Sequence, residues 1–411
     1  MVPQEPIKVQ EGKCWDFFVD LPEFDRTKVN KNLVKQAMLL EPLFEFSGSC
    51  AGCGETAYVR LVSQLFGDRM VVANATGCSS IYGGNLPTTP WAKNKEGRGP
   101  AWANSLFEDN AEFGLGMRLG ITKHANQALS LLEAVNVPAD LKEKLTTQDQ
   151  SDEAGIKAQR ENVAALKAAL AGATDEASVS LRDEFADYLV KKSVWIFGGD
   201  GWAYDIGYGG LDHVIASGEN VNICVLDTEV YSNTGGQASK STNRGAVALF
   251  AAAGKRAGKK DLGLIAMSYK NVYVGRIALG ANDAQALKVL QEAEAHNGPS
   301  LIICYCPCIN HGFDLNSQLA HQKMAVDSGY WTLLHYNPAL AAEGKAPLVL
   351  DSKAPTIPVA EYIYTENRYK QLTRNNPEVA KKLADDLQKE VDARFAFYEA
   401  MSKDTEGLIS L

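Results

Sequence analysis

The chain has 411 residues, of which 45% are hydrophobic and 22% charged, and its formal net charge is −9. This composition is typical of a globular α/β or multidomain protein with a real core, and the negative charge argues against a nucleic-acid partner. Because no apolar run is long enough to span a membrane and no secretion signal opens the sequence, we expect a cytoplasmic protein with no membrane partner.

The first 46 residues are polar and proline-marked, and they predict an extended arm followed by a short helix over residues 31–40. A Gly/Ser-rich loop then carries Cys50 and Cys53. It leads into a predicted helix over residues 55–66 and a buried strand over residues 70–73. Cys78 comes next, on a loop at the carboxyl end of that strand.

Residues 81–120 are rich in Gly, Pro, Trp and Asn, a composition that predicts a long ordered loop over a site. Over residues 123–192 Ala, Leu, Lys, Glu and Gln dominate, and Val163, Leu166 and Leu170 fall at helical spacing. This block predicts a helical insertion between two parts of a sheet.

A βαβ unit occupies the centre of the chain. An apolar run over 194–197 predicts a strand that ends in the turn Gly-Gly-Asp-Gly at 198–201, and a second run over 221–226 ends in Asp227 and Thr228. In open α/β sheets, ligands bind at the carboxyl ends of the strands. We therefore expect these polar residues to lie at one binding edge.

The chemistry of that edge favours a phosphate and a hard cation. Glycines allow a backbone to approach a pyrophosphate closely. The Asp200 carboxylate, the Thr228 hydroxyl and a nearby backbone carbonyl would suit Mg²⁺, which completes its octahedron with phosphate oxygens and water. The turn and the later polar pair resemble the thiamine diphosphate motif, with Asp227 and Thr228 in place of two asparagines.

Further βα units come later in the chain, so the predicted fold class is α/β with a mostly parallel sheet. We expect strands over residues 263–267 and 299–305, a helix over 284–295, and a peripheral tail from residue 313 with a helix over 376–402. The expected parts of the chain are an arm (1–46), a main domain (47–330, with the insertion at 123–192) and a C-terminal extension (331–411).

The cysteines are grouped rather than scattered. Cys50, Cys53, Cys78 and Cys308 neighbour Gly or Pro in loops at strand ends, where four thiolates could hold zinc or an iron–sulfur cluster. Spacing alone does not choose between the two metals. The remaining loop cysteine, Cys306, is a possible substitute for Cys308. Core positions instead suit three other thiols, namely Cys14, Cys224 and Cys304.

Five motifs occur in order along the chain: SCAGCGE at 49–55, ATGCSS at 75–80, GGDG at 198–201, DTEVYSNTGGQ at 227–237 and PCINHG at 307–312. Together they resemble the thiamine-diphosphate-binding, C-terminal part of pyruvate:ferredoxin (flavodoxin) oxidoreductases over about residues 30–330. The insertion and the tail resemble the long single-chain type of this family. The resemblance implies a thiamine-diphosphate-binding α/β fold.

The resemblance also implies roles for individual residues. The [4Fe–4S] cluster nearest the thiamine would be held by Cys50, Cys53, Cys78 and Cys308. Mg²⁺ would be bound by Asp200, the Thr228 hydroxyl and the Val230 carbonyl. Asn233 would face and orient the substrate. The residues expected to contact the cofactor are Glu55, Cys78, Gly199, Asp200, Gly201, Trp202, Thr228, Glu229, Val230, Tyr231, Ser232 and Asn233.

The implied reaction is the oxidative decarboxylation of pyruvate with coenzyme A to acetyl-CoA and CO₂, with electrons passing through the cluster to ferredoxin or flavodoxin. The family supplies the ylid-forming glutamate from another domain, and neither that domain nor a CxxCxxCxxxCP pair is found here. We therefore expect a subunit or fragment that needs the pyrimidine-side domain and a ferredoxin-like cluster domain, within an oligomer.

Three alternatives remain at this point. One is an oxidoreductase for a different 2-oxo acid, because the substrate pocket lies largely outside these residues. Another is a non-oxidative thiamine decarboxylase with a structural metal. The third is a cluster-binding electron-transfer or assembly module without thiamine. Iron analysis and thiamine diphosphate titration distinguish the last two from the oxidoreductase.

Overall fold

The computed structural model describes residues 3–85 and 87–405. Within them, eight strands form one sheet in the order β2-β1-β3-β4-β6-β5-β7-β8. The six strands from β2 to β5 in this order are parallel, β7 is antiparallel to β5, and β8 is antiparallel to β7. The strands are β1 (Met70–Ala75), β2 (Ala101–Ser105), β3 (Ser193–Gly199), β4 (Asn222–Asp227), β5 (Tyr273–Ile277), β6 (Ser300–Tyr305), β7 (Leu334–Tyr336) and β8 (Leu348–Leu350). The predicted α/β class with a mostly parallel sheet is confirmed.

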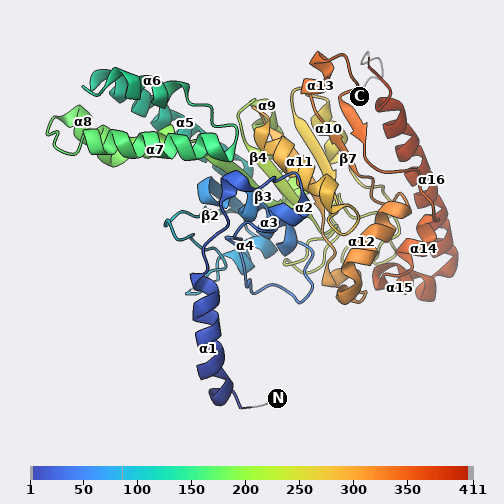
Figure 1. Ribbon diagram of the computed structural model, residues 1–411. Helices are drawn as coiled ribbons and strands as arrows, with labels where there is room; N and C mark the ends of the chain where they lie inside the picture. Colours follow the sequence, from blue (N-terminus) through green and yellow to red (C-terminus); the bar gives the residue numbers. More distant parts are fainter. Residues whose placement is uncertain (1–2, 86, 406–411) are drawn as a thin grey trace.

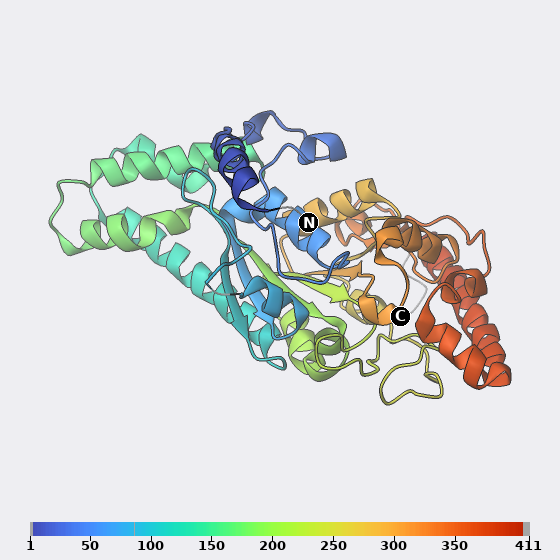
Figure 2. The ribbon, with the colours of Figure 1, turned by 90° about the horizontal axis from the view of Figure 1, so that it is seen from below.

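Helices cover both faces of the sheet and extend beyond its two ends (Figures 1 and 2). The α-helices are α1 (Glu5–Asp20), α2 (Val34–Ala37), α3 (Thr56–Phe66), α4 (Cys78–Gly83), α5 (Asn110–Ala134), α6 (Ala139–Thr147), α7 (Glu153–Ala169), α8 (Glu176–Ser180), α9 (Tyr208–Ala216), α10 (Leu262–Met267), α11 (Asp283–Ala295), α12 (Gln318–Asp327), α13 (Ala339–Ala342), α14 (Val359–Ile363), α15 (Asn367–Asn375) and α16 (Pro377–Met401).

The central strands are buried on both faces, which explains their continuous apolar sequences. Along β3 the side chains alternate: Val194 and Ile196 face a core shared with α9, α10 and α16, whereas Trp195 and Phe197 face a core shared with α3 and α11. A third, separate core lies inside the insertion, where Leu132 of α5 packs with residues of α6 and α7.

Several predicted elements are wrong. Residues 5–20 form helix α1 rather than an extended arm, because Pro6 occupies the first turn, where its missing N–H costs nothing. The predicted helix over 31–40 is reduced to the single turn α2. The predicted strand over 263–267 is helix α10, whose start is capped by Asp261, and the true strand β5 comes after it.

The predicted loop over 81–120 contains the edge strand β2 and the beginning of α5. β2 is half exposed and carries Trp, Asn and Ser, so it lacks the apolar run that marks the central strands. The tail is also less peripheral than expected: β7 and β8 extend the sheet. The proposed limits of the arm, main domain and extension stay predictions, and residues 1–2 and 406–411 lie outside the described residues.

Candidate functional site

The loops after β1, β3 and β4 meet in a small pocket of about 40 Å³. Because these strands are parallel neighbours, their carboxyl ends lie at one edge of the sheet. The pocket is lined by eleven of the twelve residues expected to contact the cofactor: Glu55, Cys78, Gly199, Asp200, Gly201, Trp202, Thr228, Val230, Tyr231, Ser232 and Asn233.

Three oxygen atoms expected to bind Mg²⁺ lie together in this pocket. The Thr228 hydroxyl oxygen is 3.0 Å from Asp200 Oδ1 and 3.1 Å from the Val230 carbonyl oxygen. On the other side, the Ser239 hydroxyl donates to Asp200 Oδ2 at 2.6 Å. Carboxylate, hydroxyl and carbonyl oxygens are the hard ligands that Mg²⁺ prefers, so this donor set fits the ion.

The electrostatics of Asp200 also fit a bound cation. Its side chain is buried, and burial together with the nearby Asp227 carboxylate raises the pKa of Asp200 to about 8. Asp227 has its own partner, since Lys259 Nζ lies 2.8 Å from Asp227 Oδ2. The described hydrogen bonds to the Asp200 carboxylate come from the Thr228 amide and from neutral hydroxyls, so a divalent cation would supply its missing positive charge.

The glycines of the turn make room for aromatic rings as well as for a ligand. A Cβ at Gly198 would lie 2.2 Å from the Trp202 ring, and one at Gly201 would lie 2.5 Å from the Tyr231 ring. Gly199 differs, because a Cβ there would meet only the Leu226 carbonyl oxygen, at 3.9 Å. Ring packing therefore requires glycine at positions 198 and 201, whereas the space beside Gly199 is open.

Glu55 and Asn233 lie in contrasting parts of the pocket. Glu55 is buried, accepts a hydrogen bond from the Tyr82 hydroxyl at 2.9 Å, and has its pKa raised to about 7 by burial. A carboxyl with such a pKa exchanges its proton near neutral pH. Asn233 lines the pocket and is exposed.

Glu229 is the expected cofactor residue that the structure does not bring to this pocket. Its backbone has a φ of 59°, and its buried carboxylate faces the opposite side of the loop. There it lies 2.8 Å from Arg368 and 3.2 Å from Lys259, and it accepts a hydrogen bond from Tyr330 at 2.6 Å. These charges lower the pKa of Glu229 despite its burial, so its role in the fold is that of a buried ion-pair partner.

Three residues near the site were missed by sequence reasoning. His311 is buried and donates from Nε2 to the Thr228 carbonyl at 2.8 Å; burial lowers its pKa to about 4, so the ring is neutral. Arg368 and Lys259 hold Glu229 from behind the loop. His311 belongs to a quoted motif, which was a usable signal, whereas Arg368 stands in the tail that was expected to be peripheral.

The loops that carry the candidate cluster cysteines contact one another. The Gly54 amide donates to the Pro307 carbonyl at 3.0 Å, and a Cβ at Gly54 would lie 2.6 Å from Pro307. The Cys308 thiol donates to the Ser232 hydroxyl at 3.4 Å, which ties this loop to the pocket. The loop of Cys50 and Cys53 and the loop of Cys308 therefore lie beside the pocket that Cys78 lines.

Three of these thiols, those of Cys53, Cys78 and Cys308, are partly buried, whereas Cys50 is exposed. Burial raises the pKa of Cys53 to about 12, and burial, Glu55 and Cys308 raise that of Cys78. In the part of the chain that the structure describes, no three His, Cys, Asp or Glu side chains are gathered tightly enough to hold a single metal ion. The assignment of Cys50, Cys53, Cys78 and Cys308 to a cluster therefore stays a prediction.

The other cysteines lie away from the pocket. Cys224 and Cys304 are buried with their sulfurs 3.6 Å apart, as expected for core thiols. Cys306 is also buried, and its thiol donates to the Cys304 carbonyl at 3.3 Å, whereas Cys308 is only partly buried. Cys14 was expected in the core and is instead exposed on α1, because that helix buries none of its residues.

Comparison with known proteins assigns the site to a class. Residues 164–304 match the family model of the thiamine pyrophosphate enzyme, C-terminal TPP binding domain. This stretch contains β3, β4 and β6 and therefore the loops of Asp200 and Thr228. Residues 164–304 are thus similar to the C-terminal, cofactor-binding domain of the thiamine pyrophosphate enzymes.

Relatives narrow that class. The chain is 58% identical to a putative pyruvate-flavodoxin oxidoreductase of Synechocystis sp. over 99% of its residues. It is 57% identical to a pyruvate-flavodoxin oxidoreductase of Trichormus variabilis and 51% identical to a pyruvate:ferredoxin oxidoreductase of Moorella thermoacetica, each over 98%. The chain is thus homologous to one segment of the pyruvate-flavodoxin and pyruvate:ferredoxin oxidoreductases, and the resemblance inferred from five motifs is confirmed.

The chain matches only part of the length of each relative. The chain spans 34% of the Synechocystis and Trichormus proteins and 35% of the Moorella protein. A solved 2-oxoglutarate:ferredoxin oxidoreductase from Magnetococcus marinus aligns over 66% of this chain and 67% of its own, with 14% identity and a TM-score of 0.40, which is too distant to carry an argument. Among residues 3–85 and 87–405, none of the helices is long and apolar enough to cross a bilayer.

Proposed function

We propose that this chain binds the diphosphate and Mg²⁺ of thiamine diphosphate and the nearest [4Fe–4S] cluster in a pyruvate:ferredoxin or pyruvate:flavodoxin oxidoreductase. The reaction converts pyruvate and coenzyme A to acetyl-CoA and CO₂. The observation that carries the proposal is the meeting of Asp200, Thr228 and the Val230 carbonyl within 3.1 Å, in a pocket whose rim holds Cys78. The identity to pyruvate oxidoreductases favours pyruvate over other 2-oxo acids.

Each group has a role in this proposal. Asp200, Thr228 and the Val230 carbonyl would hold Mg²⁺ against the diphosphate. The walls of the cofactor site would be formed by Gly199, Gly201, Trp202, Tyr231, Ser232, Glu55 and Cys78. Asn233 would hydrogen-bond the 2-oxo acid at the open side of the pocket. His311 would keep the Thr228 loop in place through the Thr228 carbonyl.

Thiamine diphosphate, when bound, acts as the electron sink for decarboxylation. Cys50, Cys53, Cys78 and Cys308 would hold a one-electron acceptor at the rim of the same pocket. Cys78 lines the pocket proposed for thiamine diphosphate and would also ligate the cluster. The distance for electron transfer from the cofactor to the cluster would therefore be short.

The remaining parts of the enzyme would come from outside this chain. Since the chain spans about a third of its relatives, we infer that a companion domain carries the glutamate that activates the aminopyrimidine and the groups that bind the pyruvate carboxylate. A ferredoxin-like domain would pass electrons from the cluster to ferredoxin or flavodoxin, and the active enzyme would be an oligomer in the cytoplasm.

The substitution Asp200→Asn tests the proposal. It keeps the shape of the side chain but removes the charge that would hold Mg²⁺, so thiamine diphosphate retained after gel filtration should fall by about tenfold or more. Asp212→Asn on α9, whose carboxylate only accepts a hydrogen bond from Tyr269, should retain normal cofactor. Equal thiamine diphosphate content in the two variants and the parent would contradict the assignment of the magnesium site.

A further inference from the structure

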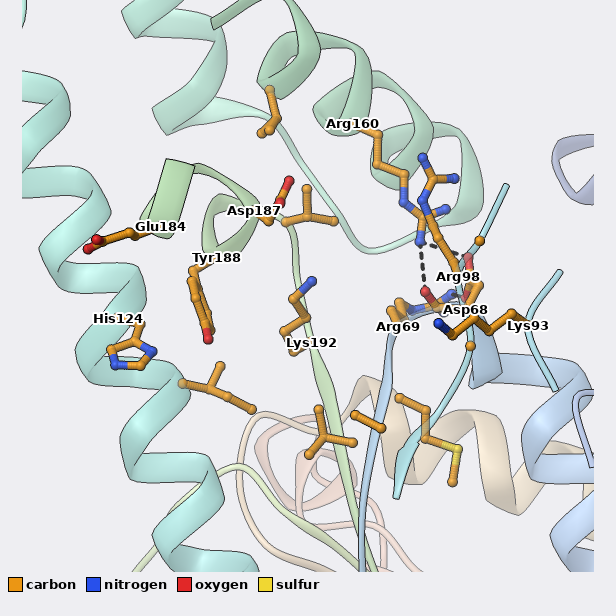
Figure 3. Close-up of a pocket in the computed structure, with 18 of the residues that line it drawn as sticks. Asp68, Arg69, Lys93, Arg98, His124, Arg160, Glu184, Asp187, Tyr188 and Lys192 are labelled. Atoms are coloured by element: carbon orange, nitrogen blue, oxygen red, sulfur yellow. Dashed lines mark hydrogen bonds and ion pairs between the residues drawn. The ribbon is translucent and has the colours of Figure 1, made fainter. Parts of the chain in front are cut away.

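A second cavity, of about 920 Å³, lies at the amino ends of the strands, opposite the first pocket (Figure 3). Its floor is formed at the amino ends of three strands, where Met70 begins β1, Ala101 begins β2 and Lys192 immediately precedes β3. Helices α5 and α7 of the insertion form its walls. Because the thiamine pocket lies beyond the carboxyl ends of the same strands, the two sites are separated by the length of the sheet.

One side of this cavity is strongly cationic. Lys93, Arg98, Arg160 and Lys192 all line it, and Figure 3 shows Arg98, Arg160 and Lys93 grouped around Asp68. The Asp68 carboxylate is shared between Arg160 at 2.8 Å and Arg69 at 2.9 Å. Arg69 also pairs with Glu153 at 3.2 Å, and Arg98 pairs with Glu96, so these arginines have acidic partners and the excess positive charge comes from the lysines.

Lys192 and Lys93 carry the uncompensated part of that charge. Among the described residues, neither ammonium has an ion pair or hydrogen bond. Lys192 stands in the centre of the cavity in Figure 3, and the acidic group that acts most strongly on its charge, Asp187, is already paired with Lys167 at 2.7 Å. Burial lowers the pKa of Lys192, with Arg160 and Arg98 adding to the effect, which shows that its charge costs free energy without a counter-ion.

The opposite side of the cavity is mainly aromatic and apolar, with the Glu184 carboxylate beside the rings. The rings of His124 on α5 and Tyr188 pack edge to face with their centroids 4.7 Å apart, and both line the cavity. Met117, Ile121 and Val163 continue this surface. A ligand that filled the space would thus meet cations at one end and rings and aliphatic groups at the other.

We propose that this cavity binds a nucleotide-like organic phosphate, with its phosphate groups between Lys192, Lys93 and Arg160 and its planar apolar part against Tyr188 and His124. The volume lies in the range of small-molecule sites. Arginine and lysine side chains are the usual partners of phosphate, and aromatic rings stack on planar bases. The proposal is independent of the thiamine assignment, because no residue is common to the two pockets.

Calorimetric titration of the purified protein with ADP, adenosine and inorganic phosphate tests the proposal. ADP should bind, and each of the other two should bind at least about tenfold more weakly, because each lacks one half of the recognised chemistry. Lys192→Met and Lys93→Met should each weaken ADP binding by about tenfold. Both lysines lack a described partner, so neither substitution breaks an ion pair of the fold. Lys345→Met, which removes an exposed lysine outside the cavity, should leave ADP affinity unchanged.

Thiamine diphosphate content should stay normal in both lysine variants, and this measurement separates the present proposal from that of the thiamine site. Absence of ADP binding would overturn the proposal, as would ADP binding that neither Lys192→Met nor Lys93→Met weakens, because the nucleotide would then occupy a different site. Equal affinity for inorganic phosphate and ADP would show that the aromatic wall plays no part, and equal affinity for adenosine and ADP would exclude phosphate recognition.

Discussion

Two buried carboxylates beside the proposed cofactor pocket have cationic partners. Asp227 and Glu229 share Lys259, and Arg368 bridges Glu229 to Glu366. Asp200, equally buried, receives hydrogen bonds without a cation at bonding distance among the described residues. A buried carboxylate without a positive partner is costly. This contrast supports the interpretation of Asp200 as a residue kept ready for a metal ion.

The cysteines allow a matched comparison at the same scale. Cys308→Ser should lower the iron content of the reconstituted protein, because its thiol lies at the pocket rim and would ligate the cluster. Cys224→Ser should leave the iron content unchanged, because that sulfur is buried beside Cys304. Iron analysis and the visible absorption of the cluster, before and after dithionite, measure both. If the two variants lost iron equally, the ligand assignment would be wrong.

At the scale of elements, the short helical turn Ile309–His311 joins two functional loops. It begins directly after Cys308, and His311 hydrogen-bonds the Thr228 carbonyl from the other end of the turn. Asn367 contacts the same region, since its amide donates to the Gly312 carbonyl at 3.1 Å. The loop of Cys308 and the loop of Thr228 are therefore fixed relative to each other by this turn. The C-terminal tail supports the turn through Asn367.

A second junction of elements predicts a pH dependence. Glu153, at the start of α7, lies 2.8 Å from Lys31, 3.2 Å from Arg69 and 3.3 Å from Arg26. Burial alone would raise the pKa of Glu153, but the three cations lower it from 4.5 to about 2. Its ionised form is therefore favoured by folding. The resulting stabilisation, roughly 3 kcal/mol, is complete above pH 4.5 and is lost as the pH falls towards 2.

Urea unfolding of the Glu153→Gln variant tests this junction. The variant should be less stable than the parent at pH 7, and the difference should shrink as the pH falls from about 4.5 to about 2. Glu343→Gln, which removes an exposed pair with Lys345, should change the free energy of unfolding by less than about 0.5 kcal/mol. A difference between parent and Glu153→Gln that did not vary with pH would contradict the ion-pair explanation.

At the scale of the whole molecule, the two ends of the chain behave differently (Figure 1). Helix α1 projects from the body and buries none of its residues, and it leaves Trp15, Phe17 and Phe18 exposed. Helix α16 instead packs along the sheet, with Leu387 and Val391 in the main core.

Deleting residues 3–21 should therefore change the melting temperature by no more than about 2 °C, since the deletion removes few packed contacts. The described contacts of α1 with the body include the ring of Trp15 on Phe46. Leu387→Ala in α16 should lower the free energy of unfolding by roughly 2–5 kcal/mol, because it leaves a cavity in the core. A large loss of stability on deleting α1 would show that the arm packs on this chain after all.

Much of the central sheet could be predicted from the sequence. β3, β4 and β6 are doubly buried, and their apolar runs end in polar turns, so both the strands and the binding edge were recognisable. Edge elements were not: β2 lacks an apolar run, and the short runs at α10 and β5 fit helix and strand equally well. Their structure depends on which neighbours they meet.

The sequence by itself determined which residue types end the central strands, and with them the thiamine motif and the grouped cysteines, because the turn after each strand is encoded by the residues next to it in the chain. Only the tertiary structure decided that Glu229 faces away from the pocket. It also brought Arg368 to Glu229 and His311 to the Thr228 carbonyl, across about 80 to 140 residues of sequence. It also created the cationic cavity, whose walls come from five separate segments. Contacts between distant segments depend on how the sheet and helices pack, which local sequence patterns do not specify.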